Sequence, residues 1–231
     1  MRLSLAIAVS LSMASLVGTA GSSSASASTS TAMESNVRGF SDARSLDHKV
    51  LRLALGAAAC ARRAGNINLD NDRLLTVIDY SKASTETRLW VLDLERERVL
   101  FEELVAHGQG SGGNFATRFS NAEGSHQTSL GLFRTGDTYV GANGYSLRLD
   151  GLEAGVNDRA RQRAIVMHGA PYVNDASVRA LGRLGRSHGC PALRPAIART
   201  VIDTIKQGSL VFAYYPDERW LNGSRFLNGC S

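Results

Sequence analysis

Between residues 74 and 215, the apolar positions of this chain repeat with a period of two, in short runs separated by glycines and polar turns. The charged segment Glu95–Arg98 lies between two such runs, as expected of the turn of a β-hairpin. Many short strands divided by turn signals are typical of sandwiches and barrels. We therefore expect a mainly β fold with a β-sandwich-like mixed sheet core. The expected strands cover residues 74–80, 88–94, 99–107, 128–134, 138–140, 145–149, 164–167 and 209–215.

Two segments have helical spacing instead. Apolar residues recur every three or four positions over residues 46–63, which are rich in alanine and are followed by Gly65 as a stop signal. Later in the chain, Pro195 is placed to open a helix and Gly208 to close it. The sequence thus predicts an N-terminal helical segment and one late helix beside the sheet.

The first residues have the pattern of a secretory signal peptide. Arg2 precedes an apolar stretch that is too short for a comfortable membrane span, and Ala25–Ala27 resembles a cleavage site. No later segment is long and apolar enough to cross a bilayer, so a retained N-terminal anchor is the alternative. We expect a signal peptide over 1–27, a disordered Ser/Ala/Thr-rich linker over 28–45, a helical segment over 46–73 and a catalytic domain over 74–231.

The charge pattern gives little support to a nucleic-acid partner. The formal net charge is +5, but the arginines are scattered and no basic stripe is interleaved with aromatic residues. A mildly basic protein would suit work beside an anionic cell-wall polymer, because net charge affects non-specific binding.

Three cysteines are an odd number for an exported chain. The simplest pairing joins Cys60, in the expected N-terminal helix, to Cys230 near the C-terminus, and leaves Cys190 free. Such a bridge suits an oxidising compartment. Sequence alone does not fix the connectivity, so the other pairings stay open at this point.

The clearest chemical motif is Ser187-His188-Gly189-Cys190, and upstream of it a β-rich run ends in His168-Gly169. A thiol is a strong nucleophile only as the thiolate, and pairing with a histidine is the usual way to form one near neutral pH. The pattern therefore indicates a nucleophilic cysteine with a histidine base.

His168-Gly169, a gap of 17 residues and Ser187-His188-Gly189-Cys190 together resemble the signature of the L,D-transpeptidase (YkuD-type) catalytic domain of bacterial cell-wall enzymes. The similarity runs from roughly Leu89 to Tyr215. Four further stretches resemble a variant branch, the murein L,D-transpeptidase catalytic domain family. These stretches are Phe119–Asn121, Gly124–Ser125, Thr128–Phe133 and Gly151–Glu153.

The resemblance implies acyl transfer on peptidoglycan stem peptides. Cys190 would be the nucleophile, His168 the general base, and the Gly169 carbonyl the group that orients the base. The backbone N–H groups of His188, Gly189 and Cys190 would form the oxyanion hole. An amine of a second stem would resolve the thioester, and neither a metal nor an organic cofactor would be needed. An exchange of roles between His168 and His188 stays open.

One position departs from the family pattern. Ala192 stands where an Arg or Asn is common two residues after the cysteine, and alanine can neither hydrogen-bond nor pair with a stem carboxylate. Arg186 and Arg194 are candidate replacements for substrate binding, and Tyr172 is a candidate wall of the groove. We expect Ser187 to form a local hydrogen bond in the loop. The departure leaves substrate choice and the balance of transfer against hydrolysis open.

Other interpretations of the same residues are weaker. Cys190 taken alone would suit a buried structural cysteine. The Gly108–Gly113 loop lacks the residues that complete a phosphate-binding loop, which favours a flexible rim of the cleft. The available zinc ligands match no familiar spacing. These ligands are His107, His126, His168, His188 and Cys190.

We therefore expect an exported L,D-transpeptidase, in the periplasm or on the outer face of the cell wall, that forms cross-links or attachments between stem peptides. The alternatives are an L,D-carboxypeptidase or peptidoglycan hydrolase on the same fold, and a catalytically weak wall-binding protein. After signal removal we expect no membrane span. The sequence sets no oligomeric state.

Overall fold

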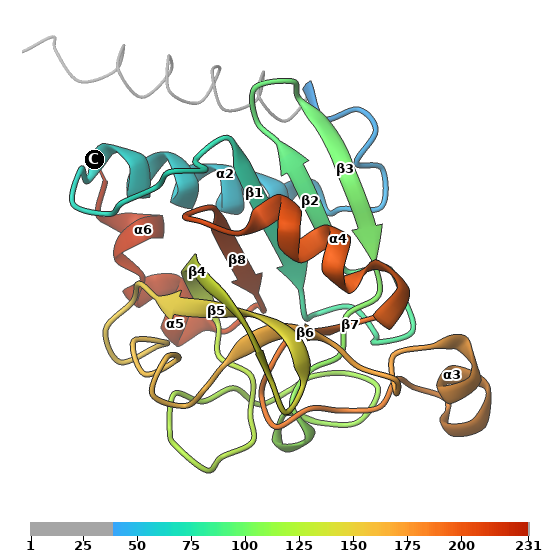
Figure 1. The fold of residues 1–231 in the computed structure, drawn as a ribbon. Helices are drawn as coiled ribbons and strands as arrows, with labels where there is room; N and C mark the ends of the chain where they lie inside the picture. Colours follow the sequence, from blue (N-terminus) through green and yellow to red (C-terminus); the bar gives the residue numbers. More distant parts are fainter. Residues whose placement is uncertain (1–38, 231) are drawn as a thin grey trace, which may run out of the picture.

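The computed structural model describes residues 39–230, which form a mostly β structure with helices around it (Figure 1). The expected signal peptide, and the expected linker as far as residue 38, lie outside the described residues. One eight-stranded sheet has the order β3-β2-β1-β8-β4-β5-β6-β7, which confirms the mainly β fold with a mixed sheet. Its strands are β1 (Leu74–Asp79), β2 (Leu89–Asp93), β3 (Arg98–Glu103), β4 (Gly131–Gly141), β5 (Gly144–Gly151), β6 (Val166–Gly169), β7 (Ala192–Leu193) and β8 (Leu210–Tyr214).

Two bridges bring the edges of the sheet together, so that it forms a nearly closed barrel. Ala106, just after β3, pairs with Ala192 in β7, and Gly108 pairs with Ser187. The Ala106 N–H donates to the Ala192 carbonyl at 2.8 Å. β1 with β8 and β6 with β7 run parallel, whereas the other neighbours run antiparallel. The segment 187–192, which contains the expected nucleophile, is thus held by both edges of the sheet.

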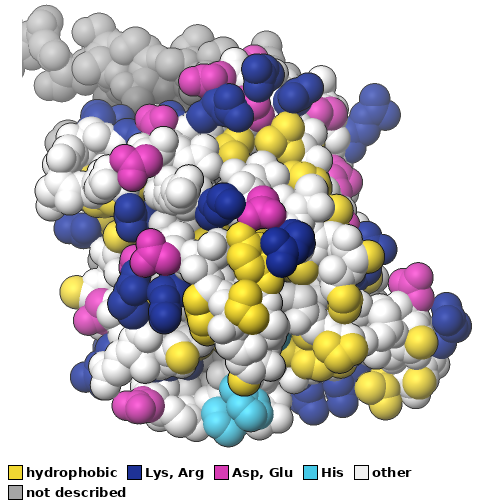
Figure 2. All heavy atoms as spheres, in the orientation of Figure 1, with side chains coloured by type: hydrophobic (Ala, Val, Ile, Leu, Met, Phe, Trp, Pro, Cys, Tyr) yellow, Lys and Arg dark blue, Asp and Glu magenta, His cyan; other side chains and the backbone are white. Residues whose placement is uncertain are grey.

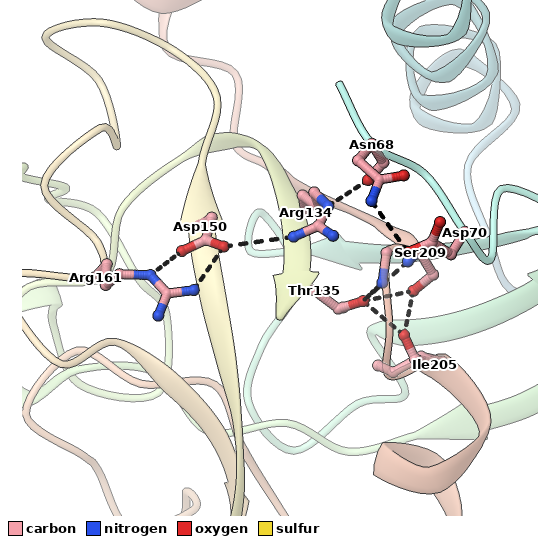
Figure 3. Close-up of polar contacts among 9 residues, drawn as sticks. Asn68, Asp70, Arg134, Thr135, Asp150, Arg161, Ile205 and Ser209 are labelled. Atoms are coloured by element: carbon pink, nitrogen blue, oxygen red, sulfur yellow. Dashed lines mark hydrogen bonds and ion pairs between the residues drawn. The ribbon is translucent and has the colours of Figure 1, made fainter. Parts of the chain in front are cut away.

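β4 is a single strand where the sequence predicted two. The expected strands within 128–140 merge into Gly131–Gly141, and the register with β5 shifts after Thr135. The buried Thr135 hydroxyl donates to the Ile205 carbonyl at 2.7 Å and accepts the Ser209 N–H at 2.9 Å (Figure 3). Such a bulge interrupts the alternation of side chains without ending the strand. The period of two is therefore broken in the sequence although the strand continues.

Both predicted helices form. α2 (His48–Arg63) begins after Asp47, whose carboxylate accepts the Lys49 N–H at 2.7 Å, and buries its alanine-rich face against β1 and β8. α4 (Pro195–Ile205) has proline at its first position, as expected, and buries Val201 and Ile202. α4 packs against β6, the strand that carries His168. This contact ties the expected base to the late helix.

Three short helices were not predicted. They are α3 (Asp175–Leu181), α5 (Glu218–Gly223) and α6 (Arg225–Asn228). Each covers two turns or fewer, which is too little for a hydrophobic period to be recognised in the sequence. α3 stands out from the body of the molecule at one end, whereas α5 and α6 lie below α2 (Figure 1).

A disulfide joins Cys60 on α2 to Cys230 after α6, with Cα atoms 5.4 Å apart, and Cys190 is free. The linker expected as far as residue 45 ends earlier, because turns at residues 40–46 fold Phe40 and Ala43 into the core. The packed body therefore begins before the expected helical segment. Among residues 39–230, no helix combines the length and the apolar character that a bilayer crossing requires.

Candidate active site

The Cys190 sulfur lies against the start of β6. The Val166 N–H points at Sγ from 3.5 Å, and the thiol donates to the Ala164 carbonyl at 3.6 Å. Ala192 pairs with His168 in parallel register, and two residues earlier on each segment are Cys190 and Val166. This register places Cys190 beside Val166, two residues or about 7 Å along the strand from His168, and within residues 39–230 no hydrogen bond joins the thiol directly to the imidazole.

The thiol is a buried group. Only 8 % of Cys190 is exposed, and burial raises the pKa of its thiol because a thiolate would lose hydration there. The Val166 N–H and the positive charge of Arg163 have the opposite effect and lower this pKa. Ionisation near neutral pH therefore requires a base that competes with the Ala164 carbonyl for the proton.

His168 is oriented by its own strand. Its Nδ1 lies 2.9 Å from the Gly169 carbonyl oxygen. A carbonyl only accepts, so this contact assigns the proton to Nδ1 and leaves the Nε2 lone pair free. Burial lowers the pKa of His168, which keeps the imidazole neutral at pH 7. A neutral imidazole with a free Nε2 can act as a general base.

The nucleophile turn is held by its own serine. Ser187 Oγ donates to the Cys190 carbonyl at 2.6 Å and accepts the Gly189 N–H at 3.1 Å. The Gly189 N–H that we expected in an oxyanion hole is therefore already used. Within residues 39–230, no other residue accepts the N–H groups of His188 and Cys190, and the Cys190 N–H faces its own sulfur. These two donors are the ones left to receive an oxyanion.

Gly189 lies where no larger residue fits. Its φ is +123°, and a Cβ there would lie 2.8 Å from the Gln127 carbonyl oxygen and 2.9 Å from Cδ1 of Ile165. Thr128 closes the same space from the side, because its Oγ1 accepts the Gly108 N–H at 2.9 Å and donates to the Gly189 carbonyl at 3.1 Å. The turn thus packs backbone to backbone on its neighbours.

A buried arginine and a buried histidine hold the segment that follows β3. Arg88 donates to the Val105 carbonyl from Nε at 3.0 Å and from Nη2 at 2.7 Å, and Nη2 also lies 2.8 Å from Nδ1 of His107. Burial lowers the pKa of Arg88 to about 10, which still leaves it protonated at pH 7. Burial, together with the Arg88 charge, lowers the pKa of His107 to about 3. The His107 carbonyl accepts the Ser187 N–H at 3.0 Å, so this pair supports the nucleophile turn.

The alternative base, His188, is exposed. Its ring stacks on that of His126, with centroids 4.3 Å apart and planes 9° from parallel. Nδ1 of His126 lies 2.9 Å from the side-chain amide nitrogen of Gln109. Histidine side chains reach the surface at the lower edge of Figure 2, where the loops between β3 and β4 lie in Figure 1. The stack is therefore a surface feature at the rim of the nucleophile turn.

Both candidate substrate-binding arginines make internal contacts. Arg194 forms a two-pronged ion pair with Glu103, with Nε–Oε2 at 2.9 Å and Nη2–Oε1 at 2.8 Å. Arg186 donates from Nη1 to the Gly112 carbonyl at 2.7 Å. Either residue would have to leave a partner to bind a stem carboxylate.

Tyr172 and Ala192 differ in their relation to the sulfur. Tyr172 is half-buried, and burial together with the charge of a Cys190 thiolate raises its pKa to about 12, which places it in the surroundings of the nucleophile. Ala192 is fully buried in β7 between His168 and Ala106. A residue at that position points into the sheet region and has no access to a substrate.

The family model described as the L,D-transpeptidase catalytic domain matches residues 42–214 of the chain. Among solved structures, an L,D-transpeptidase from Mycobacterium smegmatis is 18 % identical and has a TM-score of 0.38, with 62 % of this chain and 59 % of that chain covered. The L,D-transpeptidase LdtMt1 in complex with imipenem is 19 % identical, with a TM-score of 0.38 and coverages of 62 % and 59 %.

The helical cell shape determining protein Pgp2 from Campylobacter jejuni is 14 % identical, with a TM-score of 0.42 and coverages of 70 % and 57 %. The matched region spans about three fifths of the length of these three solved chains. The comparison with curated protein sequences found no match.

Proposed function

The chain belongs to the L,D-transpeptidase catalytic domain family, and we propose that it is an exported L,D-transpeptidase that transfers acyl groups between peptidoglycan stem peptides through Cys190. The family consists of enzymes that act on peptidoglycan. The observation that carries the proposal is the free thiol beside Val166 of β6, the same strand that two residues later carries His168, whose contact with the Gly169 carbonyl leaves Nε2 unprotonated.

The first half of the reaction forms a thioester. Nε2 of His168 takes the proton of the Cys190 thiol, and the thiolate attacks the carbonyl carbon of an L,D-peptide bond in the donor stem. The tetrahedral oxyanion is received by the N–H groups of His188 and Cys190. When the carbon–nitrogen bond breaks, the imidazolium returns its proton to the departing amine of the terminal D-residue.

The second half transfers the acyl group. An amine of a second stem attacks the thioester and gives its excess proton to His168, and the thiol of Cys190 is restored as the new amide forms. Water in place of the amine would give hydrolysis at the same site. The family relationship favours transfer to an amine over hydrolysis.

The backbone N–H groups of His188 and Cys190 matter because they stabilise the oxyanion, whose negative charge is absent from the substrate and develops in the transition state. Preorganised donors of this kind contribute about 3–4 kcal/mol each to transition-state stabilisation. The Gly189 N–H contributes by another route, since it fastens the Ser187 hydroxyl and so fixes the turn that presents its neighbours.

Export is supported by two independent features. The N-terminal residues have the composition of a signal peptide, and the Cys60–Cys230 disulfide suits an oxidising compartment. We therefore place the enzyme in the periplasm or on the outer face of the wall.

The test is covalent labelling of the intact protein by a carbapenem, read by mass spectrometry. We expect one adduct on Cys190, its loss in Cys190→Ala, and cross-linked products from defined muropeptides with the unmodified enzyme. A protein that binds cell wall but forms neither adduct nor product would overturn the proposal.

A matched pair of variants separates the two candidate bases. His168→Gln should reduce the rate of acylation by about 10²–10⁴-fold, the range for loss of a general base. His188→Gln should change it far less, because this ring lies exposed on His126. The reverse order would assign the base to His188.

A further inference from the structure

We infer that Arg163 is a positioning residue for the nucleophile: its guanidinium holds the loop of residues 120–129 together beside the Ser187–Cys190 turn and presents a fixed positive charge to the sulfur. The inference deepens the proposed function and rests on it for its consequence in catalysis. The arrangement itself is carried by the contacts of Arg163.

The guanidinium forms four hydrogen bonds with one loop. Nη1 donates to the Ser120 carbonyl at 2.7 Å and to the Ser129 hydroxyl at 2.5 Å. Nη2 donates to the Gln127 carbonyl at 2.6 Å and to the Ser125 hydroxyl at 3.2 Å. All four acceptors are neutral, and they come from both ends of the loop. A planar fork with several fixed donors suits this purpose, and a lysine could not reproduce it.

The same guanidinium lies against the nucleophile turn. Nη2 is 3.5 Å from the point that a Cβ on Gly189 would occupy, and the Gln127 carbonyl oxygen to which it donates is 2.8 Å from that point. Immediately after Arg163 come the residues that hold the sulfur, with the Ala164 carbonyl at 3.6 Å and the Val166 N–H at 3.5 Å from Sγ. The loop of residues 120–129, Arg163 and the Cys190 sulfur therefore lie close together.

The charge of Arg163 is not neutralised by an acid. None of the ion pairs within residues 39–230 includes Arg163. Arg161, two positions earlier, differs: it forms a two-pronged pair with Asp150, with Nη2–Oδ2 at 2.8 Å, and Asp150 also faces Arg134 at 3.8 Å (Figure 3). Arg161 thus anchors the segment before β6 to β5, whereas Arg163 has no acidic partner and its charge acts on the site.

Three other titratable groups of the site, Tyr80, Tyr172 and His168, carry no charge at pH 7. Burial raises the pKa values of Tyr80, after β1, and of Tyr172, after β6, so both phenols stay protonated. Burial lowers the pKa of His168, so its imidazole stays neutral. Burial lowers the pKa of Arg163 and raises that of the Cys190 thiol, and the attraction between the guanidinium and the thiolate offsets part of each shift. The stabilisation is mutual, as expected of two facing groups of opposite charge.

The test measures the thiol pKa of Cys190 in the intact, oxidised protein from the pH dependence of its alkylation by iodoacetamide. The other two cysteines are bridged and do not react. Arg163→Met should raise the apparent pKa by about one pH unit, a tenfold loss of thiolate near neutral pH. The matched control, Arg161→Met, removes an equally large cation two positions earlier and should leave the thiol pKa unchanged.

Arg163→Lys separates the effect of the positive charge from that of the hydrogen bonds to the loop. It also tests the inference if Arg163→Met fails to fold. It keeps the charge but loses the fork, so the thiol pKa should stay within about half a pH unit of the unmodified value while carbapenem acylation slows. Equal thiol pKa values in Arg163→Met and Arg161→Met would overturn the inference, as would a full-unit rise in Arg163→Lys. Alkylation needs no transpeptidase activity, so a failed proposed function and a failed role for Arg163 give different results.

Discussion

Replacing Gly189 by alanine should destabilise the protein and disturb the nucleophile turn. The added Cβ would lie 2.8 Å from the Gln127 carbonyl oxygen and 2.9 Å from Cδ1 of Ile165, at a φ of +123°. One neighbour is backbone in a loop that Arg163 fastens, so it cannot move away without breaking hydrogen bonds. Both the conformation and the available space therefore oppose the substitution.

The magnitude follows from two contributions. Forcing an alanine into this backbone conformation costs about 1–3 kcal/mol. Overpacking a tightly filled site costs about a further 1–3 kcal/mol. The sum, about 2–6 kcal/mol, is a large share of the free energy of unfolding of an ordinary domain, which is about 5–15 kcal/mol.

Gly124 supplies the matched control. It lies in the same loop region as Gln127 and has a φ of +69°, but a Cβ there would meet nothing within 4 Å. Gly124→Ala should therefore cost only the conformational part, about 1–2 kcal/mol. The reduced entropy of the unfolded chain is the same in both variants and cancels in the comparison.

Urea unfolding followed by circular dichroism measures the difference between the two variants, and carbapenem acylation of the folded fraction reports the effect on the nucleophile. We expect Gly189→Ala to be less stable than Gly124→Ala by about 1–4 kcal/mol and to acylate more slowly. If the two variants unfold within about 0.5 kcal/mol of each other, the close packing of the turn cannot be as described, because that is the usual size of a neutral surface change.

The disulfide, His107 and the Arg194–Glu103 ion pair each give a further testable expectation. The double variant Cys60→Ser/Cys230→Ser opens a loop with a sequence separation of 170 and should lose up to about 5 kcal/mol of stability in urea unfolding; a loss below about 1 kcal/mol would show that the bridge constrains little. His107, whose pKa is lowered to about 3, is neutral when folded but takes up a proton when unfolded below about pH 6.5. The contribution of neutral His107 to the free energy of unfolding is therefore complete above pH 6.5 and falls on acidification towards pH 3, by up to about 1.4 kcal/mol per pH unit. His107→Gln should flatten the dependence of the free energy of unfolding on pH. Arg194→Met should lower the free energy of unfolding by about 1–2 kcal/mol, because Glu103 is 7 % exposed, and an unchanged value would mean that solvent compensates the carboxylate.

Local patterns made much of the fold predictable. The period of two, the charged turn at Glu95–Arg98, and the proline that opens α4 each act within a few residues, so they are legible in the sequence. The merging of two expected strands into β4 could not be predicted in this way, because the Thr135 hydroxyl at the bulge donates to the carbonyl of Ile205, 70 positions away.

The candidate site likewise has a part that the sequence predicts and a part that it does not. The motif cysteine and His168 could be picked out because their residue types and spacing carry the chemistry. The pairing of Arg194 with Glu103 joins residues 91 positions apart, and no feature of either neighbourhood signals it. Arg88 was missed for a related reason: a lone arginine in a strand is more often exposed than buried. Burial of a charge is a property of the assembled sheet.

That buried charge explains how the nucleophile turn is kept in place. An arginine without a carboxylate partner is costly to bury, and no ion pair within residues 39–230 includes Arg88. Its donors instead bind the Lys82 and Val105 carbonyls and His107.

Two of these partners, Val105 and His107, flank Ala106, where the two sheet edges meet. The bridges at that place, Ala106 with Ala192 and Gly108 with Ser187, bracket the nucleophile turn on both sides. Sheet edges otherwise fray and present unpaired backbone groups. Here the closure of the barrel and the fixation of Cys190 are the same set of hydrogen bonds, so a change that loosens the edge contact should disturb the nucleophile before it unfolds the sheet.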